Sequence, residues 1–156
     1  MPNEKLFRFN PFQIKDWDEK QIYDTYMDLE GNLYDMDAPS ALAHDIEIYA
    51  NIGYLVGELI ARYTELVSNA EVTLKVKKSD MLYKLRDNWL ATKDEKAPAI
   101  DYFTSKVNSM YLDEEITLNG LQARLQRFKY AYASIESKQN ALKRRLDAIK
   151  FDTFNQ

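Results

Sequence analysis

The sequence predicts an all-α protein, a long antiparallel helical hairpin or coiled-coil-like bundle that carries an irregular N-terminal arm. Two observations lead to this prediction. After residue 38, apolar residues return every three or four positions, which is the period of an amphipathic helix. The 156 residues include only four glycines and four prolines, too few for a turn-rich β fold, and 46% of them are hydrophobic.

The first long helix is predicted over about 39–92. Asp37 is an acidic capping residue and Pro39 falls in the first turn, where its missing N–H costs nothing. No proline follows before Pro98. If this segment contains two helices, Ser79-Asp80 is the expected break. Apolar residues mark one face of the helix: Leu42, Ile46, Tyr49, Ile52, Val56, Leu59, Tyr63, Leu66, Met81, Leu82, Leu85, Trp89 and Leu90.

Two further helices are predicted over 98–112 and 114–150. Pro98 opens the first, and the acids of Asp113-Glu114-Glu115 suit the positive end of the second. The connection near 93–98 is short, so the two arms of the hairpin should be antiparallel neighbours. This pairing would bring the basic stretch 121–150 beside the more acidic 39–70 and neutralise part of its charge.

Residues 1–37 form the arm, and residues 38–156 form the helical hairpin domain. The arm contains irregularly spaced aromatic residues among acids. Asp16 or Asp18 is positioned to cap a short helix through Tyr26; alternatively, the flanks of Gly31 pair as a small β-hairpin. Leaving so many aromatic residues exposed would be costly, so we expect the arm to pack on the helical body or on a partner.

Gly53 and Gly57 lie four residues apart on one face of the first long helix. Charged residues flank them, which excludes a membrane span. The spacing therefore predicts a close helix–helix contact in which a larger side chain would clash.

The composition gives no sign of catalysis. The chain contains no cysteine and a single histidine, His44, which rules out thiolate nucleophiles and histidine-rich metal sites. There is no glycine-rich phosphate loop and no nucleophile-elbow motif. We therefore predict a binding protein with no cofactor and no metal. No apolar run reaches the ~20 residues of a membrane span, and no signal-peptide pattern opens the chain, so the cytoplasm is the expected location.

Charge is distributed unevenly along the chain. The formal net charge is −4, but residues 1–70 hold 5 basic and 13 acidic side chains, whereas residues 71–156 hold 16 and 12. Such asymmetry is typical of proteins that contact a polyanion or associate head to tail, and it also arises from ordinary solvated helix faces.

The segment from Lys75 to Trp89 combines cations with aromatic residues. Cations neutralise phosphates and aromatic rings stack on unpaired bases, so this mixture favours single-stranded DNA as ligand. The alternative is a solvated basic face whose aromatic residues pack inside the hairpin. The candidate DNA-binding residues are Lys75, Lys77, Lys78, Tyr83, Lys84, Arg86 and Trp89.

Around Lys84, Arg86 and Trp89 the sequence resembles the UvsY-type recombination mediators of tailed bacteriophages, whose basic helix has the same spacing of lysine, arginine and aromatic residue. The order of elements over about 40–150 is also similar. The resemblance implies an oligomeric helical protein of the infected bacterial cytoplasm that binds single-stranded DNA. It further implies that the protein helps load a RecA-type recombinase onto strands covered by single-strand-binding protein.

Two other functions remain open. In the first, the protein is a phage-encoded inhibitor of a host protein such as a defence nuclease, with Trp17, Tyr23 and Tyr26 as partner-binding anchors. The acids of the arm would then imitate nucleic-acid charge: Asp16, Asp18, Glu19, Asp24 and Asp28. In the second, the protein is a virion assembly factor, which predicts oligomers without affinity for DNA.

Overall fold

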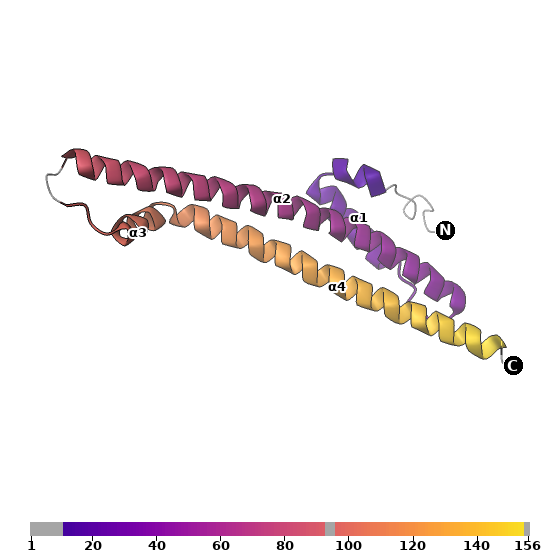
Figure 1. The fold of residues 1–156 in the computed structure, drawn as a ribbon. Coiled ribbons are helices and arrows are strands. Elements are labelled where there is room, and N and C mark those ends of the chain that lie inside the picture. Colours follow the sequence, from indigo (N-terminus) through magenta and orange to yellow (C-terminus); the bar gives the residue numbers. More distant parts are fainter. Residues whose placement is uncertain (1–10, 93–95, 155–156) are drawn as a thin grey trace. The chain divides into compact units, whose positions relative to one another are not determined.

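The computed structural model describes residues 11–92 and 96–154, and Figure 1 shows the order of their elements. The described part contains no strand, which confirms the all-α class. Its elements are a 3₁₀ helix η2 (Pro11–Asp16) and the α-helices α1 (Glu19–Gly31), α2 (Pro39–Thr92), α3 (Ile100–Met110) and α4 (Leu112–Phe154). α2 is continuous through Ser79 and Asp80, where a break was expected if there were two helices.

The β-hairpin alternative around Gly31 is wrong, because the residues that precede this glycine are helical. Asp18 begins α1 with a capping box. Its carboxylate accepts a hydrogen bond from the Gln21 backbone N–H (2.7 Å), and its own N–H donates to the Gln21 side-chain oxygen (2.9 Å). Of the two predicted caps, Asp18 is therefore the one used.

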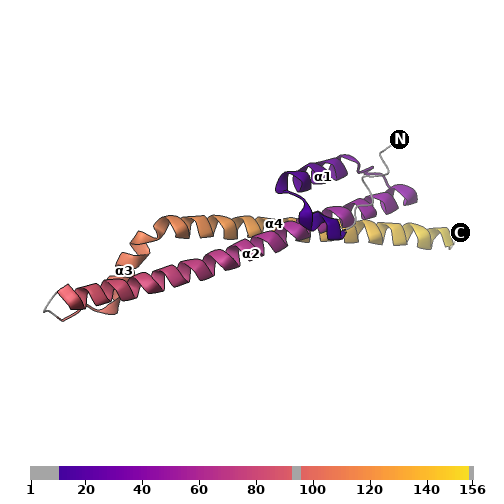
Figure 2. The same ribbon diagram turned by 90° about the horizontal axis from the view of Figure 1, so that it is seen from above.

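The chain divides into two compact units, Met1–Arg62 with Gln126–Gln156 (unit 1) and Tyr63–Leu125 (unit 2). In unit 1, the first part of α2 lies beside the last part of α4, and α1 lies along α2 (Figures 1 and 2). The Gln139 side-chain amide donates to the Ile46 carbonyl (3.2 Å), and Arg145 pairs with Asp37 (3.1 Å). These contacts join residues in reverse order, so the two segments are antiparallel.

The N-terminal arm contributes to the core of unit 1. Ile14, Ile22 and Leu29 are almost fully buried against apolar residues of the long helices. Trp17 and Tyr26 pack against the same core. Burial of these side chains holds the arm on the helical body, where it removes apolar surface from water. The long helices contribute the other buried residues of this core, which are Ile48, Ile52, Leu55, Val56, Leu59 and Ile135.

Asp45 fixes the connection between α1 and α2. Its carboxylate is buried and accepts hydrogen bonds from the backbone N–H groups of Tyr34 (2.8 Å) and Asp35 (2.9 Å). Asp35 has a φ of 51°, the left-handed region, which turns the chain toward α2. His44 contacts the Asn32 carbonyl (3.0 Å) and the Tyr34 ring. The lone histidine is thus part of this turn.

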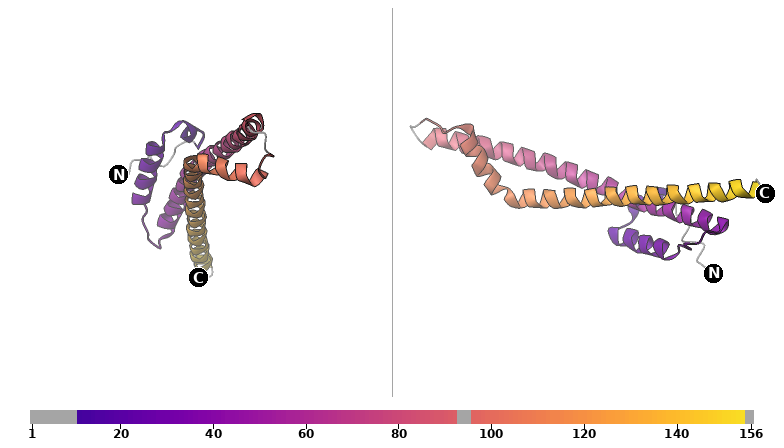
Figure 3. Two further views of the ribbon diagram at one scale, coloured as in Figure 1. Left: turned by 90° about the vertical axis from the view of Figure 1, so that its left-hand side faces the viewer. Right: turned by 90° about the horizontal axis from the view of Figure 1, so that it is seen from below.

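In unit 2, the second part of α2 packs against α3 and the beginning of α4 (Figure 3). The side-chain amide of Gln122 donates to Glu71 (2.7 Å), and Lys78 pairs with Glu115, which again gives antiparallel segments. The buried core consists of Tyr63, Val67, Leu74, Phe103, Val107 and Leu125. None of the helices that the structure describes is long and apolar enough to cross a membrane.

Candidate nucleic-acid interface

Two faces of α2 differ sharply within unit 2. The inner face packs against α3 and α4, with Leu74 buried and Lys78, Leu85 and Trp89 half-buried. The opposite face carries large apolar side chains that are exposed: Val72, Val76, Tyr83 and Leu90. An α-helix turns by about 100° per residue, so residues seven apart return to nearly the same side. Val76, Tyr83 and Leu90 follow this interval and form a stripe along the outer face.

Four cations surround the stripe. The side chains of Lys75, Lys77, Lys84 and Arg86 are exposed, and the structure gives them no hydrogen bond or ion pair within its described ranges. By helical register, Lys75 and Arg86 lie on one side of Tyr83, whereas Lys77 and Lys84 lie on the other side, beyond the exposed acids Asp80 and Asp87. Lys75, Tyr83, Lys84 and Arg86 therefore face away from α3 and α4, whereas Lys77, although exposed, lines a pocket with Asp113 and Glu114 of α4.

The other two predicted residues face inward. The Lys78 ammonium binds the Glu115 carboxylate and the Asn108 side-chain oxygen (3.1 Å), which ties α2 to α3 and α4. Trp89 packs edge-on against Tyr102 and Phe103, with ring centroids 6.2 Å apart in both pairs. Helical register could have identified both as inward-facing, because residues 74, 78, 85 and 89 repeat at intervals of four and seven on one face.

The predicted partner-binding anchors of the arm are only partly available. Trp17 and Tyr26 pack against the core of unit 1. Burial raises the pKa of Tyr26, and the nearby charge of Glu30 adds to this effect. Tyr23 is 37% exposed, and its hydroxyl donates to the Glu19 carboxylate (3.2 Å). One of the three aromatic side chains therefore stands at the surface.

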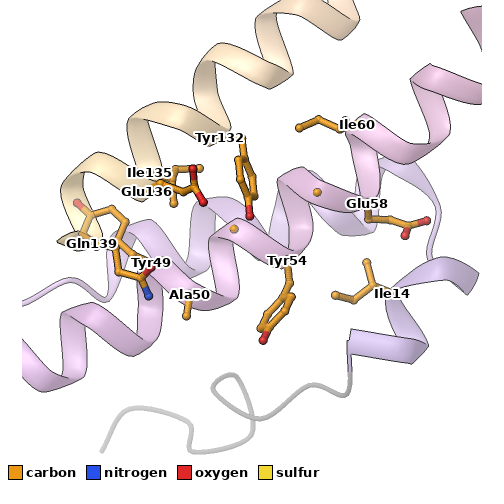
Figure 4. Close-up of a pocket in the computed structure, with 12 residues that line it drawn as sticks. Ile14, Tyr49, Ala50, Tyr54, Glu58, Ile60, Tyr132, Ile135, Glu136 and Gln139 are labelled. Carbon is orange, nitrogen blue, oxygen red and sulfur yellow. The ribbon is translucent and has the colours of Figure 1, made fainter. Parts of the chain in front are cut away.

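Unit 1 also contains a groove of about 670 Å³ between α2 and α4. Figure 4 shows Tyr132, Ile135 and Glu136 on the α4 side, with Tyr54 and Ile14 across the groove. Gly53 and Gly57 line it as well. A Cβ atom on Gly53 would make only ordinary contacts with Tyr132 and Ile135 (3.9 and 4.0 Å), and one on Gly57 would meet nothing within 4 Å. The predicted close helix–helix contact at these glycines is therefore wrong.

Metal-binding geometry is not found in the described ranges: no three histidine, cysteine or carboxylate side chains come close enough to hold an ion. Comparison of the chain with models of protein families, with curated proteins and with solved structures finds no match.

Proposed function

We propose that this protein binds single-stranded DNA through the outer face of α2 in unit 2. One observation carries the proposal: Tyr83, which is 62% exposed, shares the outer face of α2 with four exposed cations, Lys75 and Arg86 on one side and Lys77 and Lys84 beyond Asp80 and Asp87 on the other, and none of the four forms an ion pair in the described part of the chain. A DNA strand offers phosphates to such cations and base faces to such a ring, and this combination is typical of sequence-tolerant single-strand binding.

Each residue of the interface has a distinct role. Lys84 and Arg86 bind phosphates, one on each side of the stripe, and Lys75 and Lys77 add positive charge about two to three turns earlier along the helix. Tyr83 supplies the stacking surface. Lys78 and Trp89 hold α2 against α3 and α4, and so they support the interface without contacting DNA.

The biological role that we propose is that of a recombination mediator. The protein would associate with copies of itself and help load a RecA-type recombinase onto strands covered by single-strand-binding protein, in the cytoplasm of an infected bacterium. The resemblance to UvsY-type mediators around Lys84, Arg86 and Trp89 supports this role. The inward position of Trp89 assigns the aromatic part of that pattern to packing, while its two cations lie at the surface.

Fluorescence anisotropy of a labelled oligo-dT strand tests the binding step. We expect Lys84→Ala combined with Arg86→Ala to weaken binding. The plot of the logarithm of the binding constant against the logarithm of the salt concentration should become shallower by about 1.4 units of slope, since each phosphate contact to a single strand contributes about 0.7. Circular dichroism should show unchanged helicity, because both side chains are exposed.

Lys78→Ala is the matched control. It removes one positive charge from the same helix but from its inner face, so we expect DNA binding to keep its salt slope while the stability of unit 2 decreases. Equal binding by the wild type and the double variant would refute the residue assignment. Equal losses in the double variant and in Lys78→Ala would indicate a general charge effect instead of this interface.

A further inference from the structure

The apolar stripe on the outer face of α2 has no explanation in the packing of unit 2. Val76 is 54% exposed, Tyr83 62% and Leu90 57%, and each lies on the side of α2 opposite to α3 and α4. Apolar side chains of this size are usually buried when they repeat at helical spacing. Lys75 and Arg86 border the stripe on one side, and Asp80 and Asp87 border it on the other, with Lys77 and Lys84 beyond them. The cations on both sides suit an anionic ligand, and the stripe itself suits an apolar part of that ligand.

We infer that the stripe is a track for the unpaired bases of a DNA strand, an inference that rests on the proposed function. Val76, Tyr83 and Leu90 are spaced roughly 10 Å apart along α2, since a helix rises about 1.5 Å per residue. Bases lie against these three side chains, while phosphates of the strand meet Lys75 and Arg86 on one side of the stripe and Lys84 on the other. Arg86 is three residues from Tyr83 and four from Leu90, so it is a neighbour of both on the helix surface.

The track makes the protein selective for unpaired strands. In a duplex the faces of the bases are stacked on one another, so that only phosphates and groove edges remain accessible. A purely cationic surface would bind both forms by charge. Contact with an apolar track strengthens binding only for a strand whose bases can turn toward it, and this contribution adds to that of the phosphate contacts.

The test compares an oligo-dT strand with an abasic strand of the same length, which carries the same phosphates and no bases. We expect the wild-type protein to prefer oligo-dT. Val76→Thr combined with Leu90→Gln should reduce this preference by about fivefold, roughly the effect of one buried methylene group or slightly more. Its salt slope should stay unchanged because no cation is removed. A preference equal to that of the wild type would overturn the track.

Leu66→Gln is the control for side-chain polarity. Leu66 is also exposed on α2, but it lies about 100° around the helix from Tyr83. This variant should keep the wild-type preference for oligo-dT. A loss equal to that of the stripe variant would overturn the track, since it would show that any apolar residue on the helix has the same effect.

The binding measurements distinguish failure of the track from failure of the proposed function. If the wild-type protein binds neither strand at low salt, both ideas fail. If it binds both strands equally and Lys84→Ala with Arg86→Ala weakens both, the DNA-binding proposal stands and the track fails. Light scattering supplies a further check: a lower particle mass for the stripe variant would show that the stripe joins copies of the chain, which also overturns the track.

Discussion

Gly57 occupies a position in α2 where a side chain could be accommodated without cost. No atom lies within 4 Å of the place a Cβ would take. Glycine is less favourable than alanine inside a helix by roughly 0.5–1 kcal/mol. We therefore expect Gly57→Ala to raise the free energy of unfolding by about that amount in urea titrations. Gly120→Ala, at a similarly open position in α4, should give a comparable gain. Destabilisation by Gly57→Ala alone would restore the close-contact interpretation.

The hydroxyl of Tyr49 makes the stability of unit 1 depend on pH in the alkaline range. Burial raises the pKa of Tyr49 above its ordinary value of 10.0, and the charges of Asp45 and Glu30 add to this effect. The folded state therefore holds the phenolic proton more tightly than the unfolded state does. The resulting stability is complete below about pH 10 and is lost as the pH rises through the folded pKa.

Tyr49→Phe should remove this pH dependence. We expect the variant to lose less stability than the wild type between pH 9 and pH 11, measured as the urea midpoint at each pH, because it has no proton to release. Tyr130→Phe is a suitable control, since that ring is exposed on α4. The same alkaline loss in the wild type and in Tyr49→Phe would show that another group is responsible.

At the scale of elements, α1 depends on its capping box. Asp18→Ala removes the acceptor for the Gln21 N–H and should cost about 1 kcal/mol of stability. The loss should affect the whole of unit 1, because α1 places Ile22 and Leu29 in its core. Asp16→Ala provides the comparison, since Asp16 is exposed at the end of η2. Thermal or urea unfolding that showed equal losses for both would contradict the capping role.

Helical periodicity was sufficient to predict the long elements, because the bounds of α2 depend on a run of apolar residues and on the residues at its two ends. It was less informative for the arm. The helical alternative there ended at Tyr26, whereas α1 continues to Gly31 because Leu29 is buried in the core. Burial of Leu29 depends on tertiary contacts with α2, which no local pattern in residues 19–31 records.

The candidate interface was predictable only in part for a similar reason. Composition identified the segment 75–89, but not which side chains face outward. Lys77 and Lys78 are adjacent in the sequence, yet one is exposed and the other pairs with Glu115. Sequence patterning does not single out Val76 and Leu90, because Val72, Leu74 and Val76 alternate like a strand and because Leu90 directly follows Trp89 in the run of apolar residues predicted to pack. The seven-residue interval through Tyr83 was the available signal.

At the scale of the whole molecule, charges of opposite sign are partly paired within unit 1. Arg145 of α4 binds Asp37, and Lys138 lies over the Tyr49 ring. The end of α4 therefore lies beside the beginning of α2, and Arg145 pairs with an acid that precedes this helix. By contrast, Lys75 and Arg86 have neither an ion pair nor a ring contact within the described residues.

We therefore expect the removal of acidic charge from the arm and the removal of acidic charge beside Lys84 on α2 to affect DNA binding differently. Deleting the arm cannot test this, because Ile14, Ile22 and Leu29 would leave the core of unit 1. Asp24→Asn with Asp28→Asn removes two exposed charges from α1 without touching the core. Asp80→Asn with Asp87→Asn makes the same change of charge beside Lys84 on α2.

We expect the α2 pair of substitutions to tighten oligo-dT binding by about two- to fivefold per acid, since surface charge pairs are worth about 0.5–1 kcal/mol. The α1 pair should change the affinity by less than about twofold in total under the same salt conditions. Anisotropy titrations of both variants at one ionic strength measure the difference. Weaker DNA binding by the α1 variant would mean that the arm takes part in binding, and an equal gain in both variants would mean that only net charge matters.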